Sequence, residues 1–313
     1  MSLDRALDLA NAAAGAAYPN PTVGAVVVAD GKIVGEGVTE AYGGRHGEIV
    51  ALAAAAERAR GATLYVTMEP CAHHGKTPPC ADALVEAGIA CVVAGCRDPN
   101  SEAAGGLERL RRAGVAVELD DRFAARRQNE AWRTWKALGR PFVTYKAALT
   151  VDGRVTVPGT RWVTGEASRR RVHELRAASD AVAVGMGTVR ADAPRLDARD
   201  VPVLRQPRRL AFGRGPLPAD SGLELRSGGL DEELGQLAAE GVQSLLLEGG
   251  PTLATAFLEA GLVDRLLLFV APTLSGDGPR FLGDLSAPRR LLHVSMLPSG
   301  DDVLVEAYLR EPL

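Results

Sequence analysis

The sequence predicts two α/β domains, each with a buried sheet layered between helices. Apolar, β-branched runs alternate with helical patterns along the first 119 residues, Gly139-Arg140-Pro141 interrupts the pattern, and a second alternation then begins. A length of 313 residues also favours about two domains. We therefore expect a first domain over 1–119, a charged helical linker over 120–140 and a second domain over 141–313.

The elements of the first domain follow from local signals. Ser2 can cap a helix that runs to about Ala14. Asp30-Gly31 predicts a tight hairpin turn between a strand over 22–29 and a strand over 32–37. The remaining elements alternate as helix and strand, over 47–60, 62–68, 79–87, 89–94, 107–113 and 115–119.

The second domain repeats this alternation with different spacing. The polar, glycine-rich segment 222–230 predicts an exposed loop. The apolar strand over 265–270 suits either a dimer interface or a buried core, and the sequence leaves both open. The other expected elements are strands over 142–149, 181–184 and 244–247 and helices over 166–177 and 252–259.

The composition is that of a soluble globular protein rather than of a nucleic-acid or membrane protein. The chain is 46% apolar and 24% charged, and its net charge of -3 gives no bulk attraction for nucleic acid or anionic lipid. No apolar run reaches membrane-spanning length, and we see no signal peptide. We expect a cytoplasmic protein with a small-molecule substrate.

One constellation carries chemistry: His46, Cys71 and Cys80, with Glu48 two residues after the histidine. Three protein ligands leave the fourth position of a zinc ion open for water, whose pKa zinc lowers to about 7. Glu48 is placed as the catalytic residue that moves protons, as in zinc deaminases. A closed structural site, with a neighbouring histidine as fourth ligand, and a non-enzymatic zinc module are the alternatives. We expect one zinc ion per chain.

The segment between the cysteines makes this assignment more specific. Residues 69–80, EPCAHHGKTPPC, with 20–24, NPTVG, and 98–100, DPN, closely resemble the bacterial riboflavin-biosynthesis deaminase–reductase family. The resemblance implies a cytidine-deaminase-like three-layer domain that deaminates 2,5-diamino-6-(5-phosphoribosylamino)pyrimidin-4-one. The family usually has alanine where this chain has Gly47. The resemblance also implies phosphate recognition by His73 and Lys76, with Asn20, Asn100 and Ser101 near the substrate.

The second half resembles the reductase domain of the same family, whose fold is like that of dihydrofolate reductase. The matching pieces include 150–154, TVDGR, 184–192, VGMGTVRAD, and 247–253, LEGGPTL. The resemblance implies NADPH as cofactor and reduction of the ribosyl group to a ribityl chain. It implies a cofactor site made of Ala148, Trp162, Thr188, Asp192, Gly250, Pro251, Thr252, Leu253, Ala254, Thr255 and Ala256, and substrate contacts from Thr160, Arg176, Leu196, Arg199 and Glu248.

Two alternatives remain open from the sequence. The sequence predicts that a strand and a helix that the family usually has are missing around 225–231, so an active deaminase with an impaired reductase-like domain is the main alternative. A nucleic-acid-editing deaminase is disfavoured by the net charge and by the insert between the cysteines. A homo-oligomer formed through the reductase domain is a further expectation.

Overall fold

The computed structural model describes residues 2–75 and 78–313 and divides them into two compact units. The first unit comprises residues 1–138 with 312–313, and the second comprises 139–311. Among the described residues, no helix has both the length and the apolar character needed to cross a membrane.

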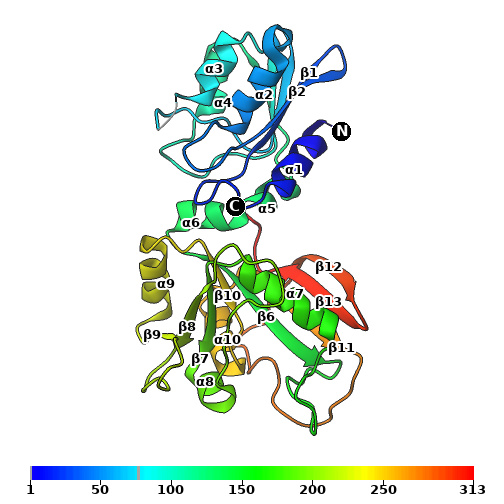
Figure 1. Cartoon of the computed structure of the whole chain (residues 1–313), viewed down its shortest axis with the longest axis vertical. Coiled ribbons are helices and arrows are strands. Elements are labelled where there is room, and N and C mark those ends of the chain that lie inside the picture. Colours follow the sequence, from blue (N-terminus) through cyan, green and yellow to red (C-terminus); the bar gives the residue numbers. More distant parts are fainter. Residues whose placement is uncertain (1, 76–77) are drawn as a thin grey trace. The chain divides into compact units, whose positions relative to one another are not determined.

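The first unit is a three-layer α/β fold around a five-stranded sheet of order β2-β1-β3-β4-β5 (Figure 1). β1 pairs antiparallel with β2 and β3, whereas β3, β4 and β5 run parallel. Apolar residues of α1 pack on one face, and those of α2, α3 and α4 pack on the other. The strands are β1 (Gly24–Ala29), β2 (Lys32–Val38), β3 (Thr63–Val66), β4 (Cys91–Ala94) and β5 (Ala116–Leu119). The helices are α1 (Ser2–Ala12), α2 (Gly47–Ala55), η1 (Ala56–Ala59), α3 (Cys80–Glu86), α4 (Gly106–Arg112), α5 (Phe123–Gln128) and α6 (Glu130–Leu138).

The predicted elements of this unit are present, with two differences. The helix expected over 47–60 ends at Ala55, because Ala56 has a positive φ of 50° and a short 3₁₀ turn follows. The segment expected as a linker folds into α5 and α6, and their Ala125 and Trp132 are buried in the core of the first unit. These two helices therefore belong to the first unit.

The second unit has an eight-stranded sheet of order β12-β13-β11-β6-β10-β7-β8-β9. In this spatial order, the six strands β11, β6, β10, β7, β8 and β9 are parallel to one another. β13 pairs antiparallel with β11 and with β12, so β12 and β13 form an antiparallel edge of the sheet. Apolar residues of α9 and α10 pack on one face, and those of α7 and α8 on the other. Its elements are β6 (Phe142–Thr150), α7 (Glu166–Ala177), β7 (Ala181–Gly185), α8 (Met186–Asp192), β8 (Arg208–Phe212), β9 (Glu224–Arg226), α9 (Leu230–Ala239), β10 (Ser244–Leu247), α10 (Pro251–Glu259), β11 (Arg265–Ala271), β12 (Leu292–Ser299) and β13 (Asp302–Tyr308).

The prediction of an exposed loop over 222–230 is wrong, and so is the prediction that a strand and a helix are missing there. β9 pairs with β8 inside this segment, and α9 begins at its end. The sequence pattern for strand β9 was weak because this strand has only three residues and one of them is a buried charged residue. The Arg226 guanidinium lies 2.9 Å from Glu240 and 3.5 Å from Glu233, so ion pairs replace apolar alternation.

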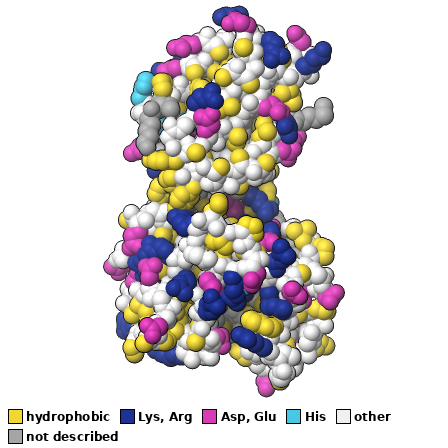
Figure 2. Space-filling model, in the orientation of Figure 1, with side chains coloured by type: hydrophobic (Ala, Val, Ile, Leu, Met, Phe, Trp, Pro, Cys, Tyr) yellow, Lys and Arg dark blue, Asp and Glu magenta, His cyan; other side chains and the backbone are white. Residues whose placement is uncertain are grey.

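The apolar strand β11 lies inside the sheet, between β13 and β6. Leu267 and Phe269 are buried, so the core interpretation of this strand is correct and it forms no dimer interface. The exposed apolar side chains lie on the edge strand β12 instead, at Val294, Met296 and Leu297. Figure 2 shows Lys and Arg side chains gathered on the face of the second unit that α7 covers.

Candidate active sites

The backbone of the first unit brings the three predicted metal ligands to neighbouring element ends. His46 immediately precedes α2, and Cys80 is the first residue of α3. Cys71 follows Pro70, where the chain turns after β3. Gly106 packs against this turn so closely that a Cβ would lie 1.7 Å from the Pro70 carbonyl oxygen. Likewise, a Cβ on Gly47 would lie 2.3 Å from the Val23 carbonyl oxygen, so this backbone is fitted to glycine.

The ligand atoms form one compact cluster. The Nδ1 of His46 lies 3.2 Å from the Cys80 sulfur and 3.7 Å from the Cys71 sulfur, and all three atoms lie within 4.8 Å of one another. These separations suit one zinc ion with Zn–S bonds of about 2.3 Å and a Zn–N bond of about 2.0 Å. Among the described residues, no fourth His, Cys, Asp or Glu joins the cluster, which favours an open coordination position.

The protonation of these groups also fits a metal site with an adjacent proton carrier. A hydrogen bond from the Cys80 side chain lowers the pKa of Cys71 and raises that of Cys80, so the two sulfurs share one proton without a metal. Burial raises the pKa of Glu48 to about 7, and the charge of Cys71 adds to this shift. The Oε2 atom of Glu48 is buried and has no hydrogen-bond partner in the described part of the chain.

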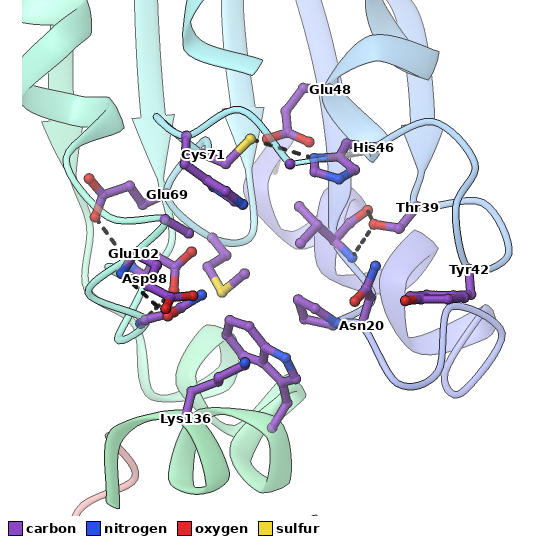
Figure 3. Close-up of a pocket in the computed structure, with 18 of the residues that line it drawn as sticks. Asn20, Thr39, Tyr42, His46, Glu48, Glu69, Cys71, Asp98, Glu102 and Lys136 are labelled. Carbon is purple, nitrogen blue, oxygen red and sulfur yellow. Dashed lines mark hydrogen bonds between the residues drawn. The ribbon is translucent and has the colours of Figure 1, made fainter. Parts of the chain in front are cut away.

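A cavity of about 290 Å³ opens beside this cluster (Figure 3). Of the predicted substrate-binding residues, Asn20, His73 and Asn100 line it. Ser101 is exposed and does not line it, whereas the next two residues do. Lys76 lies outside the residues that the structure describes.

Several lining residues were missed by the sequence reasoning. The buried Glu69 carboxylate accepts hydrogen bonds from the backbone N–H groups of Asp98, Gly105 and Leu107, at 3.0–3.2 Å. It thereby fixes the loop that carries Asn100. Burial raises the pKa of Asp98 to about 6. Glu69 belongs to the segment 69–80, EPCAHHGKTPPC, so its position close to the first cysteine could have indicated that it lies at the site.

The second unit has a larger cavity, of about 900 Å³, where the parallel strands β6, β7 and β10 end. Ligands of α/β sheets commonly bind at this edge. Gly185 and Gly250 directly precede α8 and α10, and a Cβ on Gly187 would meet nothing within 4 Å. Exposed backbone amides at such turns suit a phosphate. The predicted residues that line the cavity are Ala148, Trp162, Arg176, Thr188, Asp192, Arg199, Glu248, Gly250, Pro251, Thr252 and Leu253.

Five predicted residues of this site do not line the cavity. Ala254 is fully buried in the core because it faces the sheet, and the Thr255 hydroxyl accepts a hydrogen bond from Gly283 N–H at 2.8 Å. Ala256 is exposed on α10. Leu196 is buried in a second core cluster, and the exposed Thr160 bonds to its own loop. An α-helix completes one turn every 3.6 residues, so successive side chains point in different directions. A continuous run of helical residues therefore cannot all face one cavity.

A buried ion-pair network lies in this cavity. The Nε and Nη2 atoms of Arg176 donate to the two carboxylate oxygens of Glu248, at 2.6 and 3.0 Å, and the Lys146 ammonium lies 3.3 Å from the same carboxylate. Burial raises the pKa of Glu248, but the two cations outweigh it and bring the pKa to about 2. Arg176, predicted to pair with a substrate phosphate, is paired with Glu248 here. Lys146 was missed, although a charge within the apolar strand over 142–149 was a usable signal.

Comparison with known proteins agrees with this geometry. Residues 2–96 match the zinc-binding region of cytidine and deoxycytidylate deaminases, and residues 141–305 match the RibD C-terminal domain. The riboflavin biosynthesis protein RibD of Aquifex aeolicus is 40% identical, over 90% of this chain and 88% of its own length. That of Mycobacterium tuberculosis is 43% identical, over 89% and 87%.

Solved structures show the same similarity over nearly the whole chain. RibD of Acinetobacter baumannii has a TM-score of 0.82 at 35% identity and covers 98% of this chain and 97% of its own. The deaminase/reductase of Thermotoga maritima has the same TM-score and coverage at 33% identity. This chain therefore belongs to the RibD family of riboflavin-biosynthesis enzymes, which combine a zinc-dependent deaminase and an NADPH-dependent reductase in one chain.

Proposed function

We propose that the first unit deaminates 2,5-diamino-6-(5-phosphoribosylamino)pyrimidin-4-one and that the second reduces the ribosyl group of the product to ribityl. We assign the deaminase to 1–119 together with the helices α5 and α6, which pack on its core, and the reductase to 141–313. The observation that carries the first assignment is the three-ligand cluster beside Glu48 in a cavity, where the buried Oε2 atom of Glu48 has no hydrogen-bond partner among the described residues. A hydrolase needs both features, because one activates water and the other moves its proton.

In the deamination, each residue has a distinct role. His46, Cys71 and Cys80 hold zinc, which lowers the pKa of water at its open position. Glu48 accepts the proton of the attacking water and returns it to the departing amine, and a carboxyl with a pKa near 7 can do both. Asn20, His73 and Asn100 line the cavity and contact the substrate, with Lys76 and Ser101 as further proposed contacts.

In the reduction, the protein mainly positions two molecules against each other. The residues that line the second cavity would hold NADPH, which would supply the hydride. The turns before α8 and α10 present backbone amides to its phosphates, and Trp162 with Thr188 and Asp192 lines its site. The charged cluster around Glu248 faces the substrate, with Arg199. β9 and α9 are present, so the argument for an impaired reductase no longer holds.

The test is an assay of the purified chain on the phosphorylated pyrimidine, with ammonia and NADPH oxidation read separately. We expect ammonia release without NADPH, and NADPH oxidation only after deamination. Ammonia release with no NADPH oxidation, on the substrate or on its deaminated product, would refute the reductase assignment. No ammonia release from the zinc-loaded chain would refute the deaminase assignment.

We also propose a cellular location and an oligomeric state for this protein. Cys71 and Cys80 must be thiols to bind zinc, and this supports a reducing, cytoplasmic location. The exposed apolar side chains of β12 support a homo-oligomer through the second unit. Sedimentation of the wild type and of Met296→Glu tests this, because an interface on β12 predicts a dimer that the charged variant loses.

A further inference from the structure

Pro312 and Leu313 belong to the first unit, although they follow the second unit in the sequence. Pro312 is buried, and the carbonyl oxygen of Leu313 accepts a hydrogen bond of 2.5 Å from the Nε atom of Arg133 on α6. Figure 1 shows the end marked C beside α6. The first unit is therefore completed by residues that the chain adds after the second unit.

Arg133 is a buried cation whose donors are divided between two segments. The residue is 3% exposed. While its Nε atom donates to Leu313, its Nη1 atom donates to the carbonyl oxygen of Arg97 at 2.5 Å and to the Cys96 sulfur at 3.2 Å. A buried guanidinium is unfavourable unless its N–H groups have acceptors, so the Leu313 carbonyl helps to keep Arg133 in this position.

The Arg97 carbonyl begins the loop over 97–105, which forms one wall of the deaminase cavity. This loop lies between β4 and α4 and has no helix or strand of its own. Glu69 accepts hydrogen bonds from its backbone on one side, and Arg133 donates to its backbone from α6. Figure 3 shows the loop's Asp98 and Glu102 on the same side of the cavity as Glu69. The loop residues that line the cavity are Asp98, Asn100, Glu102 and Ala103.

Helix α6 has a second anchor that does not involve 312–313. The Asn129 side chain, directly before the helix, exchanges two hydrogen bonds of 3.0 Å with the backbone of Thr22. Trp132, next to Arg133, is buried in the core of the first unit. Loss of the Leu313 carbonyl should therefore release Arg133 and the loop that it holds, rather than the whole helix.

We propose that Arg133 is a positioning residue of the deaminase, and that Pro312 and Leu313 hold it so that the loop over 97–105 presents Asn100 to the substrate. This inference rests on the proposed deamination and deepens it. Among the described residues, neither Arg133 nor this loop lines the second cavity, so the reduction should not depend on the contact.

The first test removes the acceptor from the full chain. A variant that ends at Glu311 should have a KM for ammonia release about tenfold higher, the effect of losing one hydrogen bond to a buried charged donor, with little change in kcat. Its zinc content, and its NADPH oxidation on the deaminated product, should equal those of the wild type. Leu313→Ala keeps the carbonyl and is the matched control, so its KM should be normal. A shortened variant with the KM of Leu313→Ala would overturn the proposal.

A double-mutant cycle shows whether residues 312–313 act through Arg133. Arg133→Lys keeps the charge, but a single ammonium lacks the fork of donors that bridges the two carbonyl groups. It should raise KM about as much as the shortening does, and the two changes together should add little. Fully additive effects would mean that 312–313 act by another route, and the proposal would fail.

Hydrogen exchange tests the loop without the reaction. The backbone amides of Asp98, Gly105 and Leu107 donate to Glu69 and should exchange about tenfold faster in the shortened variant, whereas the amides of β3 should not change. Equal loop exchange in both chains contradicts the positioning role, whether or not ammonia is released. Faster exchange in β3 as well would reduce 312–313 to a general stabilising role and would also contradict it. Faster loop exchange alone, with no ammonia release from the wild type, would instead refute only the proposed deamination.

Discussion

Each unit has a buried glutamate in its cavity, and the two glutamates are opposite in charge behaviour. The Oε2 atom of Glu48 has no hydrogen-bond partner within residues 2–75 and 78–313, and burial raises the pKa of Glu48 to about 7. Glu248 is paired with Arg176 and Lys146, and its pKa falls to about 2. The first carboxyl can gain and lose a proton near neutral pH, whereas the second is a permanent charge. We therefore propose that the same residue type serves proton transfer in one site and electrostatic organisation in the other, because its neighbours differ.

The largest expected effect is on Glu48. Glu48→Gln keeps the size of the side chain but removes the proton-accepting oxygen, so we expect ammonia release to fall about 1,000-fold. Zinc content, measured by atomic absorption, and NADPH oxidation on the deaminated product should not change. Glu86→Gln, at an exposed position of α3, is the matched control. Wild-type ammonia release by Glu48→Gln would remove the proposed proton carrier.

Glu248→Gln should act on the second unit alone. It leaves Arg176 and Lys146 without a compensating charge in a largely buried site, and breaking such a pair typically costs about 3 kcal/mol. We expect NADPH oxidation to fall about 100-fold, because the cluster that faces the substrate is no longer held. Ammonia release should stay at the wild-type rate.

Stability in urea checks the structural part of this prediction. Glu232→Gln, at an exposed position of α9, should resemble the wild type in both stability and activity. If Glu248→Gln were as stable and as active in reduction as Glu232→Gln, Glu248 would have no organising role.

The two sites also differ in how far the sequence alone could predict them. The zinc ligands and Glu48 form a local pattern in which each residue sits at the end of a strand or the start of a helix, so their convergence was predictable. Lys146 and Glu248 are about 100 residues apart, and only the parallel pairing of β6 with β10 brings them together. Trp132 and Lys136 of α6, which line the first cavity, were missed for a related reason, since α6 looked like a linker until its packing was known.

Fold prediction failed where charges replace apolar patterns. β9 was missed because Arg226 is buried through Glu233 and Glu240 rather than through apolar contacts. The edge strand β12 was missed because its side chains are mostly exposed, and exposed strands carry little alternation. β8, α8 and β13 were also missed, so all the missed elements lie in the second unit, whose sheet depends on distant pairings.

Acid should weaken the second unit through Glu248. Its pKa is about 2 in the folded chain against an ordinary 4.5, so the folded state binds fewer protons between these values. The stabilisation is therefore complete above pH 4.5 and is lost as the pH falls toward 2, by about 3 kcal/mol in total. Urea unfolding of the full chain at pH 5.5, 4.5 and 3.5, followed by circular dichroism, should show a steeper loss for wild type than for Glu248→Gln. Parallel pH profiles would mean that Glu248 is not ion-paired in solution.

The smallest effect is expected at Trp162, which tests whether the second cavity holds the cofactor. Its half-exposed indole lies between Arg161 and Arg169, with guanidinium carbons 4.9 and 5.4 Å from the ring centroid. Loss of one aromatic contact corresponds to about 1 kcal/mol, so Trp162→Phe should weaken NADPH binding about fivefold, measured by the fluorescence of NADPH itself. Val151→Ala, which trims an exposed side chain of the same unit outside the cavity, should bind NADPH normally. If both variants bound NADPH as the wild type does, the cofactor would not contact Trp162, and the glycine turns before α8 and α10 would have to hold it elsewhere in the cavity.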